Sequence, residues 1–75
     1  MDVSARLKIT EKGIDEIERR THKLSIRKRS VLVHLKKPQT VEYVLDKSVF
    51  HPDEIIYEIK ALAHEGFLAV DKNLD

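Results

Sequence analysis

The sequence predicts a small, mainly α-helical domain with a minor β component. Two observations lead to this fold class. The stretch from Gln39 to Asp71 has the pattern of a short helix, a turn, a longer helix and then a strand. Before it, an alternating segment is followed by a capped helix. A length of 75 residues fits one domain, and we therefore expect a single domain over residues 1–75.

The N-terminal segment predicts a strand that runs directly into a helix. Apolar and polar side chains alternate from Val3 to Ile9, as they do in a half-buried strand. Thr10 then has the position of an N-cap. Ile9 and Ile14 have the spacing of a hydrophobic staple, which would fix the angle at which the chain enters the helix.

This first helix is expected to run to about Arg20. Its inward residues are predicted to be Ile14 and Ile17. Gly13 lies inside the helix and weakens it by about 1 kcal/mol relative to alanine. We therefore expect the helix to depend on its packing against the rest of the domain.

The next segment allows two interpretations. In the first, Ser25 caps a helix that carries Leu24, Lys28, Val31, Leu32 and Leu35 on one face. In the second, Ser30–Leu35 and Thr40–Leu45 are strands, because both segments also alternate and both are rich in β-branched residues. The element order would then be βαββαβ, that of a ferredoxin-like α+β fold.

The longer helix near the C-terminus has the clearest boundaries. Pro52 suits a first helical position, and Asp53 and Glu54 place negative charge at the positive end of the helix dipole. Gly66 is expected to end the helix in a Schellman motif, in which Phe67 contacts Leu62. The apolar stripe consists of Ile55, Ile56, Ile59, Leu62 and Ala63.

Charge is strongly segregated along the chain, although the net charge is only +1. Residues 1–37 hold 11 basic and 5 acidic residues, whereas residues 38–75 hold 3 basic and 8 acidic residues. Such asymmetry can mark a surface for nucleic acid or an acidic partner, or it can mean that the two halves attract one another. The basic segment of residues 19–37 has no acidic residue, and its cations are Arg19, Arg20, Lys23, Arg27, Lys28, Arg29, Lys36 and Lys37.

Several motifs together resemble bacterial winged helix-turn-helix domains. They are the Thr10-Glu11-Lys12-Gly13 helix start, the basic Arg27-Lys28-Arg29 helix, Thr40-Val41 at the start of a short helix, and the run from Leu62 to Leu68 that closes the last helix. The resemblance implies DNA binding in transcription regulation, with Pro52–Glu65 as the recognition helix. One feature departs from the pattern, because only five residues follow Val70. Either any wing is stunted, or Arg6–Ile9 pairs with Phe67–Val70 instead.

The expected recognition helix is unusually acidic for a DNA-reading element. Three of its seven outward positions are carboxylates, and this works against the counterion release that drives binding to DNA phosphates. The seven positions are Asp53, Glu54, Tyr57, Glu58, Lys60, Ala61 and His64. In one interpretation the basic segment contacts the phosphates of duplex DNA. In the alternative, the scaffold binds a protein partner or a second copy of itself through Glu54, Tyr57 and Glu58.

The sequence offers no other site chemistry. It has no cysteine, and no two of its four histidines have the helical spacing of two metal ligands. Only two glycines are present, so no glycine-rich phosphate loop is available, and no nucleophile motif occurs. We therefore expect no enzyme activity, no cofactor and no metal. Because the chain has no signal-peptide core and no apolar run of about 20 residues, we also expect a cytoplasmic protein without membrane contact.

Overall fold

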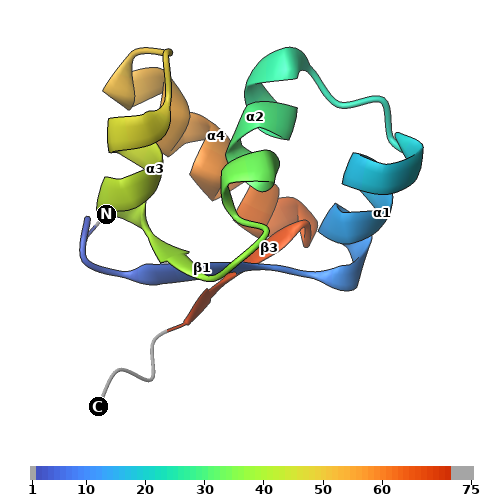
Figure 1. Cartoon of the computed structure of the whole chain (residues 1–75), viewed down its shortest axis with the longest axis horizontal. Helices are drawn as coiled ribbons and strands as arrows, with labels where there is room; N and C mark the ends of the chain where they lie inside the picture. Colours follow the sequence, from blue (N-terminus) through green and yellow to red (C-terminus); the bar gives the residue numbers. More distant parts are fainter. Residues whose placement is uncertain (1, 72–75) are drawn as a thin grey trace.

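The computed structural model describes residues 2–71, which form four helices packed on one side of a small antiparallel sheet (Figure 1). The elements follow the order β1 (Arg6–Ile9), α1 (Glu11–Arg19), α2 (Ile26–His34), β2 (Gln39–Thr40), α3 (Val41–Lys47), α4 (Pro52–Glu65) and β3 (Leu68–Asp71). The predicted class, mainly α with minor β, is confirmed. None of the helices within residues 2–71 has both the length and the hydrophobicity needed to cross a bilayer.

The central strand of the sheet is the first one in the sequence. The spatial order is β2-β1-β3, and both pairings are antiparallel. Leu7 lies opposite Gln39 on one side and Val70 on the other. The first strand therefore pairs with the last, which was one of the two expected alternatives. It is shorter than the predicted Val3–Ile9, because residues 2–5 form a turn closed by a 3.1 Å hydrogen bond from Ala5 N to Asp2 O.

Both contested segments are helical, so the ferredoxin-like alternative is wrong. Capping decides the outcome at each start: Ser25 Oγ accepts from Lys28 N at 3.3 Å, and Thr40 Oγ1 accepts from Tyr43 N at 3.1 Å. The buried side chains also follow helical spacing. On α2 and α3 they are Val31, Leu32, Leu35, Val41 and Val44.

The helix α4 has the predicted boundaries at both ends. Pro52 is its first residue, and His51 caps it by accepting from Asp53 N through Nδ1 at 3.1 Å. At the C-terminus Gly66 has φ 87°, Gly66 N donates to Ala63 O, and Phe67 N donates to Leu62 O at 2.9 Å. These two bonds are those of a Schellman motif. The core consists of Leu7, Val31, Leu32, Leu35, Val41, Val44, Ile55, Ile59, Leu62, Phe67 and Leu68.

The helix α1 is rotated away from its expected orientation. Thr10 caps it as predicted, by accepting from Gly13 N at 3.2 Å, but Ile14 is 41% exposed instead of inward. Gly13 and Glu16 are the buried residues. The rotation follows from close packing, because Gly13 lies directly against the Phe67 carbonyl oxygen and the Ile9 side chain. Gly13, which has a low helix propensity, therefore determines the orientation of α1 relative to the sheet.

Candidate nucleic-acid interface

The cations of residues 19–37 do not form one continuous surface. Arg29 is occupied in holding α1 and α2 together. Its guanidinium donates to Glu16 O at 2.7 Å and to Ile17 O at 3.4 Å, and so satisfies carbonyl groups at the C-terminus of α1. The same side chain lies 3.7 Å from the Glu16 carboxylate and is only 22% exposed. Arg29 is therefore a structural residue and is not available to phosphates.

The Glu16 carboxylate organises the loop that joins α1 to α2. It is fully buried, and its oxygens accept from His22 N at 2.6 Å and from Leu24 N at 3.0 Å. Burial by itself would raise the pKa of Glu16. The Leu24 and His22 N–H donors and the Arg29 guanidinium outweigh that effect, and the pKa lies below its ordinary value. Glu16 is therefore a charged anchor for the loop.

Arg27 and Lys28 face α4 and are paired with its acidic side chains. Arg27 Nη1 lies 3.8 Å from Glu54 Oε2 and 4.0 Å from Glu58 Oε2, and Lys28 Nζ lies 4.0 Å from Glu65 Oε2. The basic and acidic halves of the chain thus attract one another across the α2–α4 contact. Most of these groups are partly exposed, so each pair contributes at most about 1 kcal/mol to stability. Their main effect is to neutralise both helices locally.

Glu58 is not a surface residue, in contrast to the sequence analysis. Its relative exposure is 7%, and its Oε1 has no hydrogen-bond partner within the described structure. The i, i+4 spacing from Glu54 turns both carboxylates toward α2. The proposed partner surface of Glu54, Tyr57 and Glu58 therefore reduces to Tyr57, which is 69% exposed, and the half-exposed Glu54.

The outward face of α4 is much less acidic than the sequence suggested. With Glu54, Glu58 and Glu65 turned toward α2, the exposed positions on the adjacent, solvent-facing side are Asp53, Tyr57, Lys60 and His64. This face carries one carboxylate, one lysine, one histidine and an aromatic ring. The electrostatic objection to a DNA-reading role for α4 is therefore weaker, although Asp53 and the half-exposed Glu54 remain at its N-terminus.

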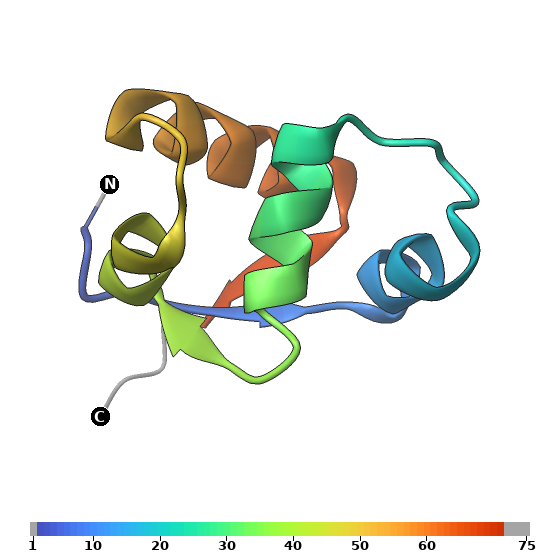
Figure 2. The same cartoon turned by 45° about the horizontal axis from the view of Figure 1, so that its top comes forward.

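The remaining cations of the basic segment are exposed but lie in two separate regions. Arg19 ends α1, and Arg20 and Lys23 lie in the α1–α2 loop, whereas Lys36 and Lys37 follow α2 at its other end, as Figure 2 shows for these two segments. Arg19 forms a long, exposed ion pair with Asp15 at 3.7 Å. Arg20 and Lys23 have positive φ values of 54° and 51°.

The chain matches no protein-family model, no curated protein and no solved structure. The candidate site therefore depends on its own geometry. Within residues 2–71 no three acidic, histidine or cysteine side chains gather as metal ligands.

Sequence reasoning missed two features of the site. The first is the anchoring role of Glu16, for which the sequence carries no local signal. The second is the separation of the acids of α4 from Tyr57, Lys60 and His64. That separation could have been found, because Glu54, Glu58 and Glu65 have spacings of four and seven residues and so share one side of a helix.

Proposed function

We propose that this domain binds duplex DNA through the helix pair α3–α4, with the outward face of α4 directed at base edges in the major groove. The observation that carries the proposal is the sorting of charge on α4, whose three glutamates are paired with α2 while Asp53, Tyr57, Lys60 and His64 face solvent. Two helices joined by the short turn of residues 48–51 have the connectivity of a helix-turn-helix unit.

The sheet gives this proposal further support. In the winged helix-turn-helix arrangement that the sequence resembles, the recognition helix is followed by a strand that pairs with a second strand of the wing. Here β3 follows α4 and pairs antiparallel with β1 over four residues, from Arg6 opposite Asp71 to Ile9 opposite Leu68. The N-terminal strand thus supplies the partner of the strand that follows α4.

The proposal changes which cations contact phosphates. Arg27, Lys28 and Arg29 are engaged inside the domain, so they contribute little to DNA affinity. Phosphate contacts then come from exposed groups such as Lys60 and the loop cations Arg19, Arg20, Lys23, Lys36 and Lys37. Because several of these side chains are spread over two loops, we expect binding to be weak and strongly dependent on salt.

Fluorescence anisotropy with a labelled mixed-sequence duplex, measured over a series of salt concentrations, tests the proposal. We expect Lys60→Ala to lower the slope of log K against log salt by about 0.9, the effect of one lost phosphate contact. The matched control is Lys8→Ala, which removes the same charge from an exposed residue of β1. Equal effects of the two variants, or no binding at physiological salt, would refute a role for α4.

Protein interaction is the second candidate, favoured by three large side chains that are strongly exposed. Tyr57 is 69% exposed, Val49 is 90% exposed and Ile26 is 77% exposed. Large exposed aromatic residues are common in protein interfaces. Sedimentation of the wild-type chain and of Tyr57→Ala distinguishes this candidate, because a dimer that Tyr57→Ala dissociates, together with unchanged DNA binding, would favour it over the first.

A further inference from the structure

A surface pocket of about 250 Å³ lies between α1, the end of β1 and the residue that follows the cap of α2. Its lining residues are Ile9, Ile14, Ile17, Glu18 and Lys36. The rotation of α1 described above creates this pocket, because it leaves Ile14 partly exposed beside Ile9 and Ile17 instead of packing it into the core. Three isoleucines therefore line one hollow, two of them partly buried against the core and one partly exposed.

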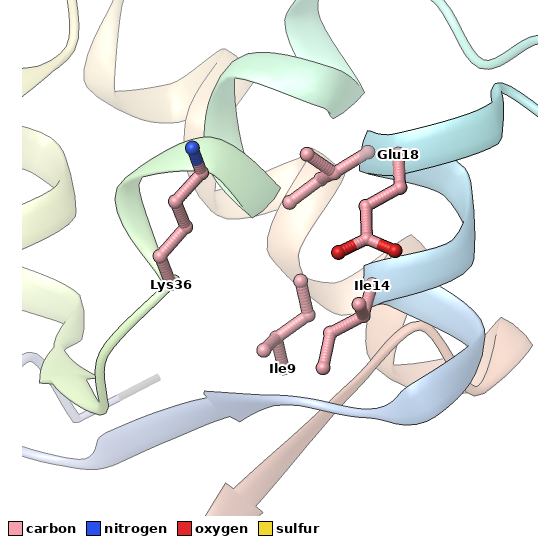
Figure 3. Close-up of a pocket in the computed structure, with 5 residues that line it drawn as sticks. Ile9, Ile14, Glu18 and Lys36 are labelled. Atoms are coloured by element: carbon pink, nitrogen blue, oxygen red, sulfur yellow. The ribbon is translucent and has the colours of Figure 1, made fainter.

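Two oppositely charged side chains line this pocket beside the apolar surface. Figure 3 shows Glu18 on α1 directly above Ile14, and Lys36 beyond α2 on the other side of Ile9 with its ammonium group directed upward in this view. Within the described residues neither charged side chain takes part in an ion pair or a hydrogen bond. The pocket thus offers an unpaired cation and an unpaired anion on opposite sides of an apolar floor.

We propose that this pocket binds a small zwitterion with an apolar side chain, of the class of a free branched-chain α-amino acid. The ligand carboxylate would pair with Lys36, its ammonium group with Glu18, and its side chain would contact the three isoleucines. A ligand with only one charge would leave the other charged side chain of the pocket without a partner, so we expect the ligand to carry both charges.

The size of the pocket sets the expected affinity. A volume of about 250 Å³ is below the usual range for drug-sized ligands but is sufficient for a molecule of about nine heavy atoms. Ligands of this size that bind at open, hydrated sites reach dissociation constants on the order of 1 mM. The proposal shares Lys36 with the proposed phosphate contacts, but it uses none of the α4 residues, so the loss of leucine binding in Glu18→Gln can be measured separately from DNA binding.

The test is an NMR titration of the full chain, with isoleucine δ1 methyl groups labelled, using L-leucine up to about 50 mM. We expect saturable shifts of the methyl groups of Ile9, Ile14 and Ile17. Two analogues serve as controls: 4-methylpentanoate lacks the ammonium group, and 3-methylbutylamine lacks the carboxylate. Each should bind about tenfold more weakly than leucine, because each loses one charged contact.

Variants of the pocket charges complete the test. Glu18→Gln and Lys36→Gln should each raise the dissociation constant of L-leucine about tenfold, and their amide spectra show whether the fold is intact. The matched controls Glu11→Gln and Lys37→Gln remove the same charges from exposed positions outside the pocket and should have no effect. Shifts that do not saturate, equal binding of the two analogues and leucine, or unchanged affinity in Glu18→Gln would each overturn the proposal.

Discussion

Replacing Gly13 by alanine should destabilise the domain, although helix propensity predicts the opposite. In an exposed helix interior this change stabilises by about 1 kcal/mol. Here a Cβ atom at position 13 would clash with the Phe67 carbonyl oxygen and would lie 2.6 Å from Ile9 Cγ1, about 1 Å short of ordinary contact. The carbonyl belongs to the backbone and accepts from Thr10 N at 3.1 Å, so relief of the clash requires α1 to move and strains that hydrogen bond.

The magnitude follows from these opposing effects. Overpacking costs about 1–3 kcal/mol and a weakened hydrogen bond about 1 kcal/mol, whereas the gain in propensity returns about 1 kcal/mol. We expect a net loss of about 1–2 kcal/mol and a fall in Tm of roughly 5–15 °C. Urea and thermal unfolding followed by circular dichroism measure both quantities. An increase in Tm for Gly13→Ala would refute the conclusion that close packing at Gly13 determines the position of α1.

The second glycine provides a control with a different physical cause. Around Gly66 there is space for a side chain, since the nearest atom to an added Cβ is Lys12 Cδ at 4.0 Å, but its φ of 87° is unfavourable for other residues. Asparagine tolerates this backbone region better than alanine does. We therefore expect Gly66→Asn to be more stable than Gly66→Ala, whereas Gly13→Asn should be less stable than Gly13→Ala because it is larger.

Three further outcomes follow from the structure. Because the pKa of Glu16 is lower in the folded state, the ionised carboxylate stabilises the fold fully above the ordinary pKa of 4.5, and this stabilisation is lost as the pH falls through the folded pKa. Glu16→Gln should lower the free energy of unfolding by about 3 kcal/mol near neutral pH and flatten the acid limb of a stability–pH curve. Glu58→Met should stabilise by about 1 kcal/mol in urea unfolding, since it removes a buried carboxylate oxygen without a hydrogen-bond partner, and a loss of stability would contradict this reading. Arg20→Gly should raise Tm by a few degrees by relieving a positive φ, whereas Arg19→Gly, inside α1, should lower it.

Local signals allowed most helix boundaries to be predicted. The caps at Thr10 and Ser25 and the glycine ending at Gly66 each involve atoms within a few residues, so the sequence contains the whole interaction. The choice between helix and strand for residues 30–35 and 40–45 was less certain, because a period of 2 and a period of 3.6 both fit a short apolar segment. Packing against α4 favours the helical period in both.

The errors have a common cause in contacts between distant residues. Gly13 looked like a weak helix position because the atoms that require it belong partly to Phe67, 54 positions later. Glu58 was expected to face solvent and the role of Glu16 was missed, because the partners of both carboxylates lie on α2 and in the loop before it. The candidate interface on α4 was misjudged for the same reason, since the charge of a helix face depends on what packs beside it.

The central position of β1 also affects how the chain can fold during synthesis. Leu7 has its β3 partner Val70 63 positions later, so the middle strand leaves the ribosome first and gains its full set of hydrogen bonds last. Until Leu68–Asp71 emerges, one edge of β1 lacks that partner and the apolar side chain of Leu7 lacks part of its core. Such long sequence separation slows folding. The helices can form while translation continues, but the sheet that holds them together closes only after translation has delivered the last strand.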